Sequence, residues 1–311
     1  MSDLLPPSID PIAAARWAVL AAKAENAPWL HEEVARRMAE RLRYIRLPVS
    51  KWAHWEPGRG GRQGHALVAS HYPSAESFMV EASTAGVGRE GRSDEKNMAL
   101  SWLSRLSRGR HTQKTVSVPP ENAVQMVWAN MLAHHSADPA NLLAQWHKTL
   151  ATDGFVMFSC LGPDTLRELR TLYAKLGWPP PTHEFTDMHD WGDLLVKAGF
   201  AEPVMDMERI TLTFESPGRL LAELRGLGRN FHVARFPALR GRSWLVRLEA
   251  AIEEHLRLPT ERPGDATGLL GLSFEVIYGH AIKPAPRVKV SPRAEIGLED
   301  MKIALRQRKQ T

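Results

Sequence analysis

The residues best suited to bind a ligand form a short glycine-rich stretch, Glu56-Pro-Gly-Arg-Gly-Gly61. Gly58 and Gly60 carry no side chain, so the backbone there can approach a ligand closely. Glu81 follows a short apolar run, 78–80, and a carboxylate at the end of a second strand can accept hydrogen bonds from both ribose hydroxyl groups. This order predicts one half of a nucleotide-binding sheet. A surface loop that merely contains glycine is the alternative interpretation.

Further polar side chains follow an expected strand at 124–128. Asn130 comes just after this strand, so it either contacts a ligand at the end of the sheet or closes a turn. His134 and His135 come next, but no third residue has the spacing of a zinc ligand, and we expect no metal. The sequence also lacks the Gly-x-Ser-x-Gly motif of serine hydrolases. It therefore identifies no catalytic residue.

Arginine is abundant in the segment 215–272, which lies between two expected strands and contains two expected helices. Helices inserted there can fold as a lid over the edge of the sheet that binds ligands. Arg225, Arg229 and Arg235 are the residues that we expect to contact an acidic partner. An ordinary solvated helix face and a nucleic-acid surface are the alternatives, and nucleic acid is the weakest of the three.

The order of the expected elements indicates how these residues are positioned. Strands are expected at 78–80, 124–128, 155–159, 203–214 and 273–282. Helices are expected at 32–45, 65–70, 96–106, 139–150, 164–175, 188–198, 217–227 and 243–256. Alternation of the two predicts a mostly parallel sheet with helices on both faces. In such sheets, ligands bind beyond the carboxyl ends of the strands.

Composition narrows the class of protein. Apolar residues make up 43% of the 311, enough for a large core, and the net charge of +5 is compatible with an acidic partner. Cys160 is the single cysteine and lies in an apolar run, so we expect an inert thiol in a reducing compartment. No apolar stretch approaches the length of a membrane span. We therefore expect a cytoplasmic protein that does not bind a membrane.

Three stretches resemble the malonyl-carrier-protein O-methyltransferases of biotin synthesis, which depend on S-adenosylmethionine. The first is the expected helix and its flanks at 29–47. The second is Phe158-Ser-Cys-Leu-Gly-Pro-Asp-Thr-Leu-Arg-Glu-Leu169, extended by 185–195. The third is Phe274-Glu-Val-Ile-Tyr-Gly-His280. The resemblance extends over about 28–283.

The resemblance implies a Rossmann-like class I methyltransferase fold, with a mostly parallel seven-stranded sheet and a helical lid. The implied organisation is an N-terminal helical segment at 1–47, a methyltransferase domain at 48–283 that includes the lid at 215–272, and a basic tail at 284–311. S-adenosylmethionine is the implied cofactor. Its implied ligands are Glu56, Gly58, Gly60, Glu81 and Asn130.

The implied reaction is O-methylation of a malonyl group on acyl carrier protein, which the lid arginines would receive. A free carboxylate, with a pKa of about 4, is ionised at neutral pH and needs no general base. Two positions depart from the family, because Lys114 and Gln125 stand where the resemblance places aspartates. A methyltransferase-like assembly factor of respiratory complex I shares this architecture. The alternative function is therefore a catalytically degenerate methyltransferase fold that acts by binding a partner.

Overall fold

The computed structural model describes residues 8–21, 26–81, 113–116, 119–259 and 268–286. The expected helix at 96–106 lies outside these ranges, as does most of the expected basic tail. The proposed division at residues 47 and 283 stays a prediction.

Seven strands form one sheet in the order β3-β2-β1-β4-β5-β7-β6. Their bounds are β1 (Lys51–Trp55), β2 (Glu76–Val80), β3 (Gln113–Val116), β4 (Val124–Ala129), β5 (Leu150–Leu161), β6 (Ala201–Phe214) and β7 (Leu270–Ile282). Strands β1 to β5 are parallel, and β7 is antiparallel to both of its neighbours. The predicted mostly parallel, seven-stranded sheet is confirmed. The strand order reverses between β1 and β4, and ligands of such sheets bind at this point.

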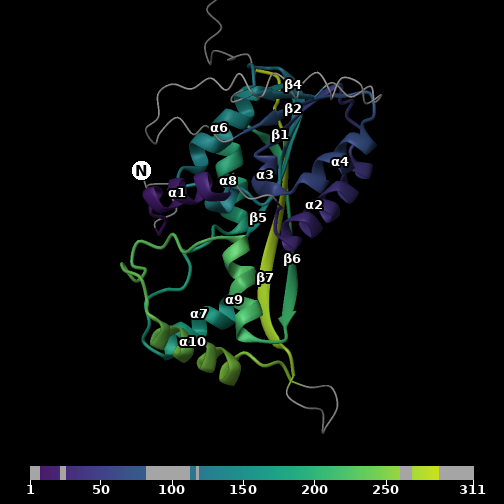
Figure 1. The fold of residues 1–311 in the computed structure, drawn as a ribbon. Helices are drawn as coiled ribbons and strands as arrows, with labels where there is room; N and C mark the ends of the chain where they lie inside the picture. The colour runs from purple at the N-terminus through teal and green to yellow at the C-terminus, as the bar shows by residue number, and fades with distance from the viewer. Residues whose placement is uncertain (1–7, 22–25, 82–112, 117–118, 260–267, 287–311) are drawn as a thin grey trace, which may run out of the picture.

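Helices cover both faces of the sheet (Figure 1). Their bounds are α1 (Pro11–Ala21), α2 (Trp29–Arg41), α3 (Pro57–Gly60), α4 (Arg62–His71), α6 (Pro139–Thr149), α7 (Arg167–Lys175), α8 (Met188–Lys197), α9 (Pro217–Leu227) and α10 (Arg242–His255). The start of α6 follows the expected signals: Asp138 accepts a hydrogen bond from the backbone N–H of Asn141, and Pro139 is the first helical residue.

The two faces of the central strands bury different side chains, because successive residues of a strand point in opposite directions. On β4, Met126 and Trp128 belong to the core beneath α2 and α4, whereas Val127 and Ala129 belong to the core beneath α6 and α8. On β1, His54 is fully buried and its ring lies parallel to that of His65 on α4, with ring centres 5.6 Å apart. This aromatic packing explains how a strand with a histidine at its centre is buried.

Two elements begin elsewhere than the sequence predicts. The strand expected at 155–159 is longer in the structure, because β5 already pairs with β4 at Leu150. Asp153, with φ of 62°, is held there by a backbone hydrogen bond of 2.8 Å to Lys283. α7 was expected from 164 but begins at Arg167, because the N–H of Asp164 donates to the carboxylate of Glu275 on β7.

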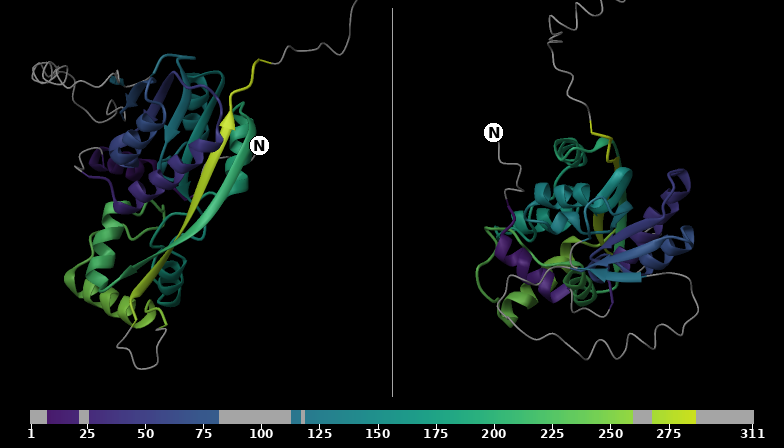
Figure 2. Two further views of the ribbon diagram at one scale, coloured as in Figure 1. Left: turned by 90° about the vertical axis from the view of Figure 1, so that its right-hand side faces the viewer. Right: turned by 90° about the horizontal axis from the view of Figure 1, so that it is seen from above.

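β6 and β7 run far beyond the other strands, and α7, α9 and α10 gather on this extension (Figures 1 and 2). α9 and α10 come between β6 and β7 in the chain, where the helical lid was expected. The lid also contacts the N-terminus: the N–H of Asp10 donates to Phe231, and Ile9 and Trp17 pack around that phenylalanine. Segments far apart in sequence therefore meet above the sheet.

Candidate functional site

The glycine-rich stretch after β1 folds as one tight helical turn, α3. Glu56 ends β1 in the left-handed conformation, with φ of 47°, and its N–H donates to the carbonyl of Val80 at 2.7 Å. Its carboxylate lies 2.5 Å from Nη1 of Arg59. Glu56 therefore already has a charged partner within the chain.

Gly58 and Gly60 have different surroundings. A Cβ atom on Gly60 would lie 2.5 Å from the carbonyl oxygen of Asn130, so glycine is required there by the packing of two backbone segments. A Cβ atom on Gly58 would meet no atom within 4 Å, and Gly58 lines a cavity. Of the two glycines, Gly58 is the one whose open surroundings leave room for a ligand.

Glu81 lies at the same edge of the sheet as Glu56. Trp55 pairs with Val80 in the parallel register of β1 and β2, so the two acids leave neighbouring strands side by side. The side chain of Glu81 is exposed. This arrangement agrees with the expected placement, and the contact of Glu81 with a cofactor stays a prediction.

Asn130 is fully buried at the end of β4 and joins several elements. Its amide donates to the carbonyls of His31, at 2.8 Å, and of Gly60. Its Oδ1 accepts from the hydroxyl of Ser159 at 2.7 Å. The side chain therefore holds α2, the glycine turn and β5 together. Its expected role as a direct cofactor ligand stays a prediction.

The two departures from the family lie away from this edge. Gln125, near the amino end of β4, accepts hydrogen bonds from the N–H of Ser50, at 3.2 Å, and of Lys51, at 2.8 Å. Lys114 pairs with Glu76, the first residue of β2. Both side chains therefore stabilise the starts of strands, whereas ligands of this fold bind at the strand ends.

A cavity of about 410 Å³ lies between the glycine turn, α1 and the end of α9; we call it the glycine-turn cavity. Its lining includes Trp17, His31, Gly58, Arg59, Arg225 and Arg229. Because Gly58 follows β1 directly, this cavity lies beyond the carboxyl end of that strand. It is where a ligand of this fold is expected.

Four buried polar atoms of this lining have no hydrogen-bond partner among the described residues: Nε2 of His31, Nε of Arg59, Nε1 of Trp17 and Nδ1 of His135. Nδ1 of His31 lies 2.7 Å from the carbonyl of Arg59 and must donate to it, which leaves Nε2 as an unprotonated acceptor. Burial lowers the pKa of His31 to about 4, so this ring is neutral at pH 7. The second atom is Nε of Arg59, a donor. Among these unpartnered groups, His31 is an acceptor and Arg59 is a cationic donor.

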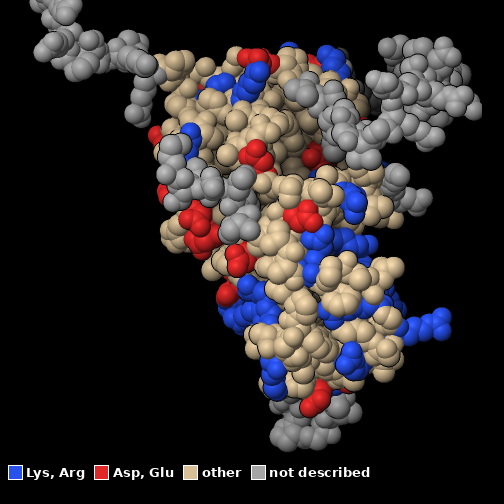
Figure 3. Space-filling model, turned by 90° about the vertical axis from the view of Figure 1, so that its left-hand side faces the viewer, with Lys and Arg blue, Asp and Glu red and all other residues tan. Residues whose placement is uncertain are grey.

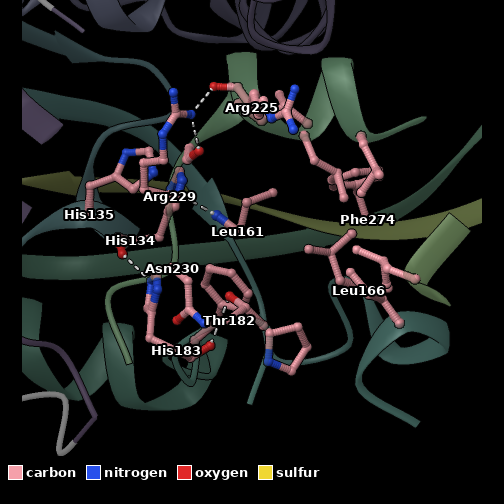
Figure 4. Close-up of a pocket in the computed structure, with 18 of the residues that line it drawn as sticks. His134, His135, Leu161, Leu166, Thr182, His183, Arg225, Arg229, Asn230 and Phe274 are labelled. Carbon is pink, nitrogen blue, oxygen red and sulfur yellow. Dashed lines mark hydrogen bonds between the residues drawn. The ribbon is translucent and has the colours of Figure 1, made fainter. Parts of the chain in front are cut away.

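A second cavity, of about 270 Å³, lies beneath the lid (Figure 4); we call it the lid cavity. Its walls are largely apolar side chains from α7, α9, α10 and β7, among them Leu166, Leu224, Trp244 and Phe274. At one end lie the buried rings of His134 and His183, and burial lowers the pKa of His183 to about 4. The lid cavity can therefore take a partly apolar ligand that makes a few polar contacts.

The three lid arginines have different environments. Arg225 and Arg229 line both cavities, and the guanidinium of Arg229 lies 4.8 Å from the ring centre of Trp17. Arg235 instead pairs with Asp10 at 2.7 Å and donates to the carbonyl of His232. Because its guanidinium already forms an ion pair within the chain, Arg235 is the weakest of the three candidates for contact with a partner.

Positive side chains gather on the lower part of the face shown in Figure 3, where the lid lies. Several lid arginines are exposed and have no ion pair with the residues that the structure describes: Arg219, Arg225, Arg229, Arg242 and Arg247. Such a surface attracts an acidic macromolecule over a distance of about 10 Å at moderate salt.

Within the described ranges, no three His, Cys, Asp or Glu side chains group closely enough to hold a metal ion. None of the helices in those same ranges has the length and apolar character needed to cross a membrane.

Sequence reasoning missed His31 and Arg59 as site residues. Both residues lie in stretches that the sequence analysis singled out: His31 in the first stretch that resembles the family, and Arg59 in the glycine-rich stretch. Their unpartnered atoms depend on a hydrogen bond between them and on burial by α1 and α9, which spacing along the chain does not reveal.

No protein-family model matches the chain. Curated relatives named malonyl-acyl-carrier-protein O-methyltransferase include those of Gallionella capsiferriformans, 38% identical over 83% of this chain and 86% of the relative, and Laribacter hongkongensis, 35% identical over 86% and 87%. That of Nitrosospira multiformis is 33% identical over 88% and 90%. Among solved structures, the YcgJ protein of Bacillus subtilis is 12% identical over 81% of this chain and 99% of its own, with a TM-score of 0.49. Its similarity to these curated relatives shows that this chain belongs to the malonyl-acyl-carrier-protein O-methyltransferase family.

Proposed function

We propose that this chain transfers a methyl group from S-adenosylmethionine to the free carboxylate of a malonyl group carried by acyl carrier protein, a step of biotin synthesis. The relatives' name supports the acceptor. The observation that carries the proposal is that two cavities share Arg225 and Arg229 at the carboxyl edge of β1 and β4. One cavity suits a cofactor, and the other suits an acceptor.

The glycine-turn cavity fits the amino-acid end of the cofactor. That end carries a carboxylate and an ammonium group, and the unpartnered atoms of Arg59 and His31 are a cationic donor and an acceptor. Glu81, at the end of β2, would hold the ribose hydroxyls. Gly58 would allow the close approach of the backbone. When bound, the cofactor supplies an electrophilic methyl group on a sulfonium sulfur.

The lid cavity would receive the acyl acceptor. A carboxylate is ionised at pH 7, so the chain needs to orient it rather than deprotonate it. Arg225 and Arg229 would attract it, and the apolar lid would keep water from the reacting atoms. This arrangement explains why the sequence shows no acid–base pair.

The exposed arginines of the lid would steer the acidic carrier protein toward the lid cavity. Exposed ion pairs contribute only ~0–1 kcal/mol each, so they would speed and orient encounter more than they tighten binding. Cys160 is buried and burial raises the pKa of its thiol, which leaves no reactive cysteine among the described residues. This is compatible with a reaction in the cytoplasm.

The degenerate alternative depended on Lys114 and Gln125. Because both side chains stabilise strand starts at the far edge, they give no reason to expect loss of cofactor binding. Calorimetric titration with S-adenosylhomocysteine separates the two functions. The proposal predicts saturable binding that Arg59→Gln weakens on the order of 10- to 100-fold, since a charged hydrogen bond contributes ~1.5–3 kcal/mol. Absence of binding at millimolar ligand would contradict the proposal.

A further inference from the structure

His134 lines the lid cavity, and the protonation of its ring is fixed by its neighbours. The backbone N–H of Leu161 donates to Nδ1 of His134 at 3.3 Å. A nitrogen that accepts carries no hydrogen, so in the neutral ring the hydrogen lies on Nε2. The ring therefore has a defined donor and a defined acceptor.

The Nε2–H donor has no partner among the residues that the structure describes. His134 is only 4% exposed and lines the lid cavity, so water around the protein does not readily satisfy this donor. An unpaired buried donor costs about 1–3 kcal/mol, which a ligand oxygen would recover on binding. Burial also keeps the pKa of His134 well below its usual range, so the ring stays neutral.

The surroundings of His134 indicate what kind of oxygen this donor suits. Its ring packs against those of His135, with centres 4.0 Å apart, and Phe185. Nε2 of His183 donates to the backbone carbonyl of His134 and holds the segment in place. Arg225 and Arg229 lie along the same cavity and supply positive charge. A rigid neutral donor near two cations suits an anionic oxygen.

We propose that Nε2–H of His134 donates to a carboxylate oxygen of the acyl acceptor and makes the enzyme selective for acyl groups that end in a carboxylate. The inference rests on the proposed function and adds a selectivity residue to it. His134 would bind the oxygen that is not methylated and would keep its proton throughout, because a carboxylate has none to lose. Once the ester forms, the acceptor is neutral, and the two arginines no longer attract it.

Two substitutions separate the proposed contact with the acceptor from the hydrogen bond by which His134 supports the fold. In His134→Asn, the side-chain amide occupies the place of Nδ1, so an acceptor for Leu161 is kept while the Nε2 donor is removed. In His134→Gln, the amide nitrogen reaches the place of Nε2, so the donor is kept while the acceptor for Leu161 is lost. The pair therefore distinguishes a ligand contact from support of the fold.

Steady-state kinetics with malonyl carrier protein test the proposal. His134→Asn should raise KM for this acceptor on the order of 10- to 100-fold, the loss of one hydrogen bond to a charged group, with KM for S-adenosylmethionine unchanged. His134→Gln should stay within about threefold of wild type for the acceptor, yet melt at a lower temperature. Acetyl carrier protein, which lacks the carboxylate, should inhibit wild type and His134→Asn equally.

Three results would overturn the inference: an unchanged acceptor KM in His134→Asn, an equal loss in both variants, or a rise in the KM for the cofactor instead. Failure of the proposed function is distinguishable, because wild type itself would then methylate no malonyl carrier protein. If wild type is active and the Asn variant matches it, only the selectivity role of His134 is wrong.

Discussion

At the scale of single residues, the informative groups are buried histidines whose two ring nitrogens differ. His31 donates through Nδ1 and presents an acceptor, whereas His134 accepts through Nδ1 and presents a donor. The two rings line different cavities, so the chain offers opposite hydrogen-bonding groups to the two proposed ligands. The sequence alone shows only two histidines, because a tautomer is set by neighbours in space.

His31→Asn tests the acceptor in the glycine-turn cavity. The amide of Asn can still donate to the carbonyl of Arg59 from the place of Nδ1, but the acceptor at Nε2 is lost. We expect the dissociation constant for S-adenosylhomocysteine to rise by about tenfold, with KM for malonyl carrier protein unchanged. Calorimetry measures the first and kinetics the second. A variant that binds the cofactor product as wild type does would refute the assignment of His31.

The buried histidines also predict how stability depends on pH. Burial lowers the pKa of His31 and His183 from 6.5 to about 4, and that of His54 to about 3. Below pH 6.5 the unfolded chain binds protons that the folded chain refuses, so stability falls as pH decreases from 6.5 toward 4. Each of these groups contributes up to roughly 3 kcal/mol of this loss.

Urea unfolding measured from neutral to mildly acid pH checks this dependence. The free energy of unfolding should be level above the usual histidine pKa and decline steadily below it. In His31→Asn, the decline should be shallower, because one of the titrating groups is gone. A free energy that stays level down to about pH 5 would contradict the assignment of these rings as buried and neutral.

At the scale of elements, the turn after β1 distinguishes two glycines that the sequence treated alike. Gly60→Ala should lower the free energy of unfolding by about 1–3 kcal/mol, because its Cβ would press on the carbonyl of Asn130. Gly58→Ala should leave stability nearly unchanged and weaken cofactor binding instead, because the added methyl group enters the cavity. Thermal unfolding and calorimetry of both variants test this. Equal destabilisation by the two would show that the turn is packed differently.

Arg225 on α9 and Arg229 just beyond its end, here called the α9 pair, should govern encounter with the carrier protein. Arg225→Glu combined with Arg229→Glu should raise the dissociation constant for malonyl carrier protein by tenfold or so at low salt, and less at high salt. The matched control, Arg43→Glu with Arg46→Glu, changes the net charge equally beside the amino end of β1. Surface plasmon resonance at two salt concentrations compares them. An equal effect of both pairs would mean that only net charge matters.

Arg235 serves as a second comparison on the lid. Arg235 pairs with Asp10, so Arg235→Ala should loosen the contact between the lid and the N-terminal segment. We expect the free energy of unfolding to fall by only about 1 kcal/mol. Carrier-protein binding should change less than for the α9 pair. A large loss of binding with unchanged stability would restore Arg235 to the docking surface.

At the scale of the whole molecule, the sequence predicts the arrangement better than the contacts. The alternation of strands and helices is a local signal, and the structure confirms the sheet that it implies. The early start of β5 depends on pairing of Leu150 with β4 and on the backbone hydrogen bonds of Lys283 with Asp153 and Gly154, so it could not be read from the segment alone. The same holds for the cavities, which arise where α1 and the lid meet above the strand ends.

The departures at Lys114 and Gln125 illustrate the same limit. In the sequence they are positions that are acidic in the family but hold a cation and a neutral amide here, which favoured a degenerate protein. In the structure they stabilise the starts of β1 and β2, remote from the strand ends. The role of a residue in a motif can therefore be inferred only when the edge of the sheet at which it lies is known.

Mass spectrometry of malonyl carrier protein, incubated with the purified chain and S-adenosylmethionine, tests the central claim most directly. We predict that the malonyl carrier protein gains the mass of one methylene unit and that acetyl carrier protein gains none. If the chain binds S-adenosylhomocysteine in calorimetry yet leaves the mass of malonyl carrier protein unchanged, methyl transfer to this acceptor is contradicted.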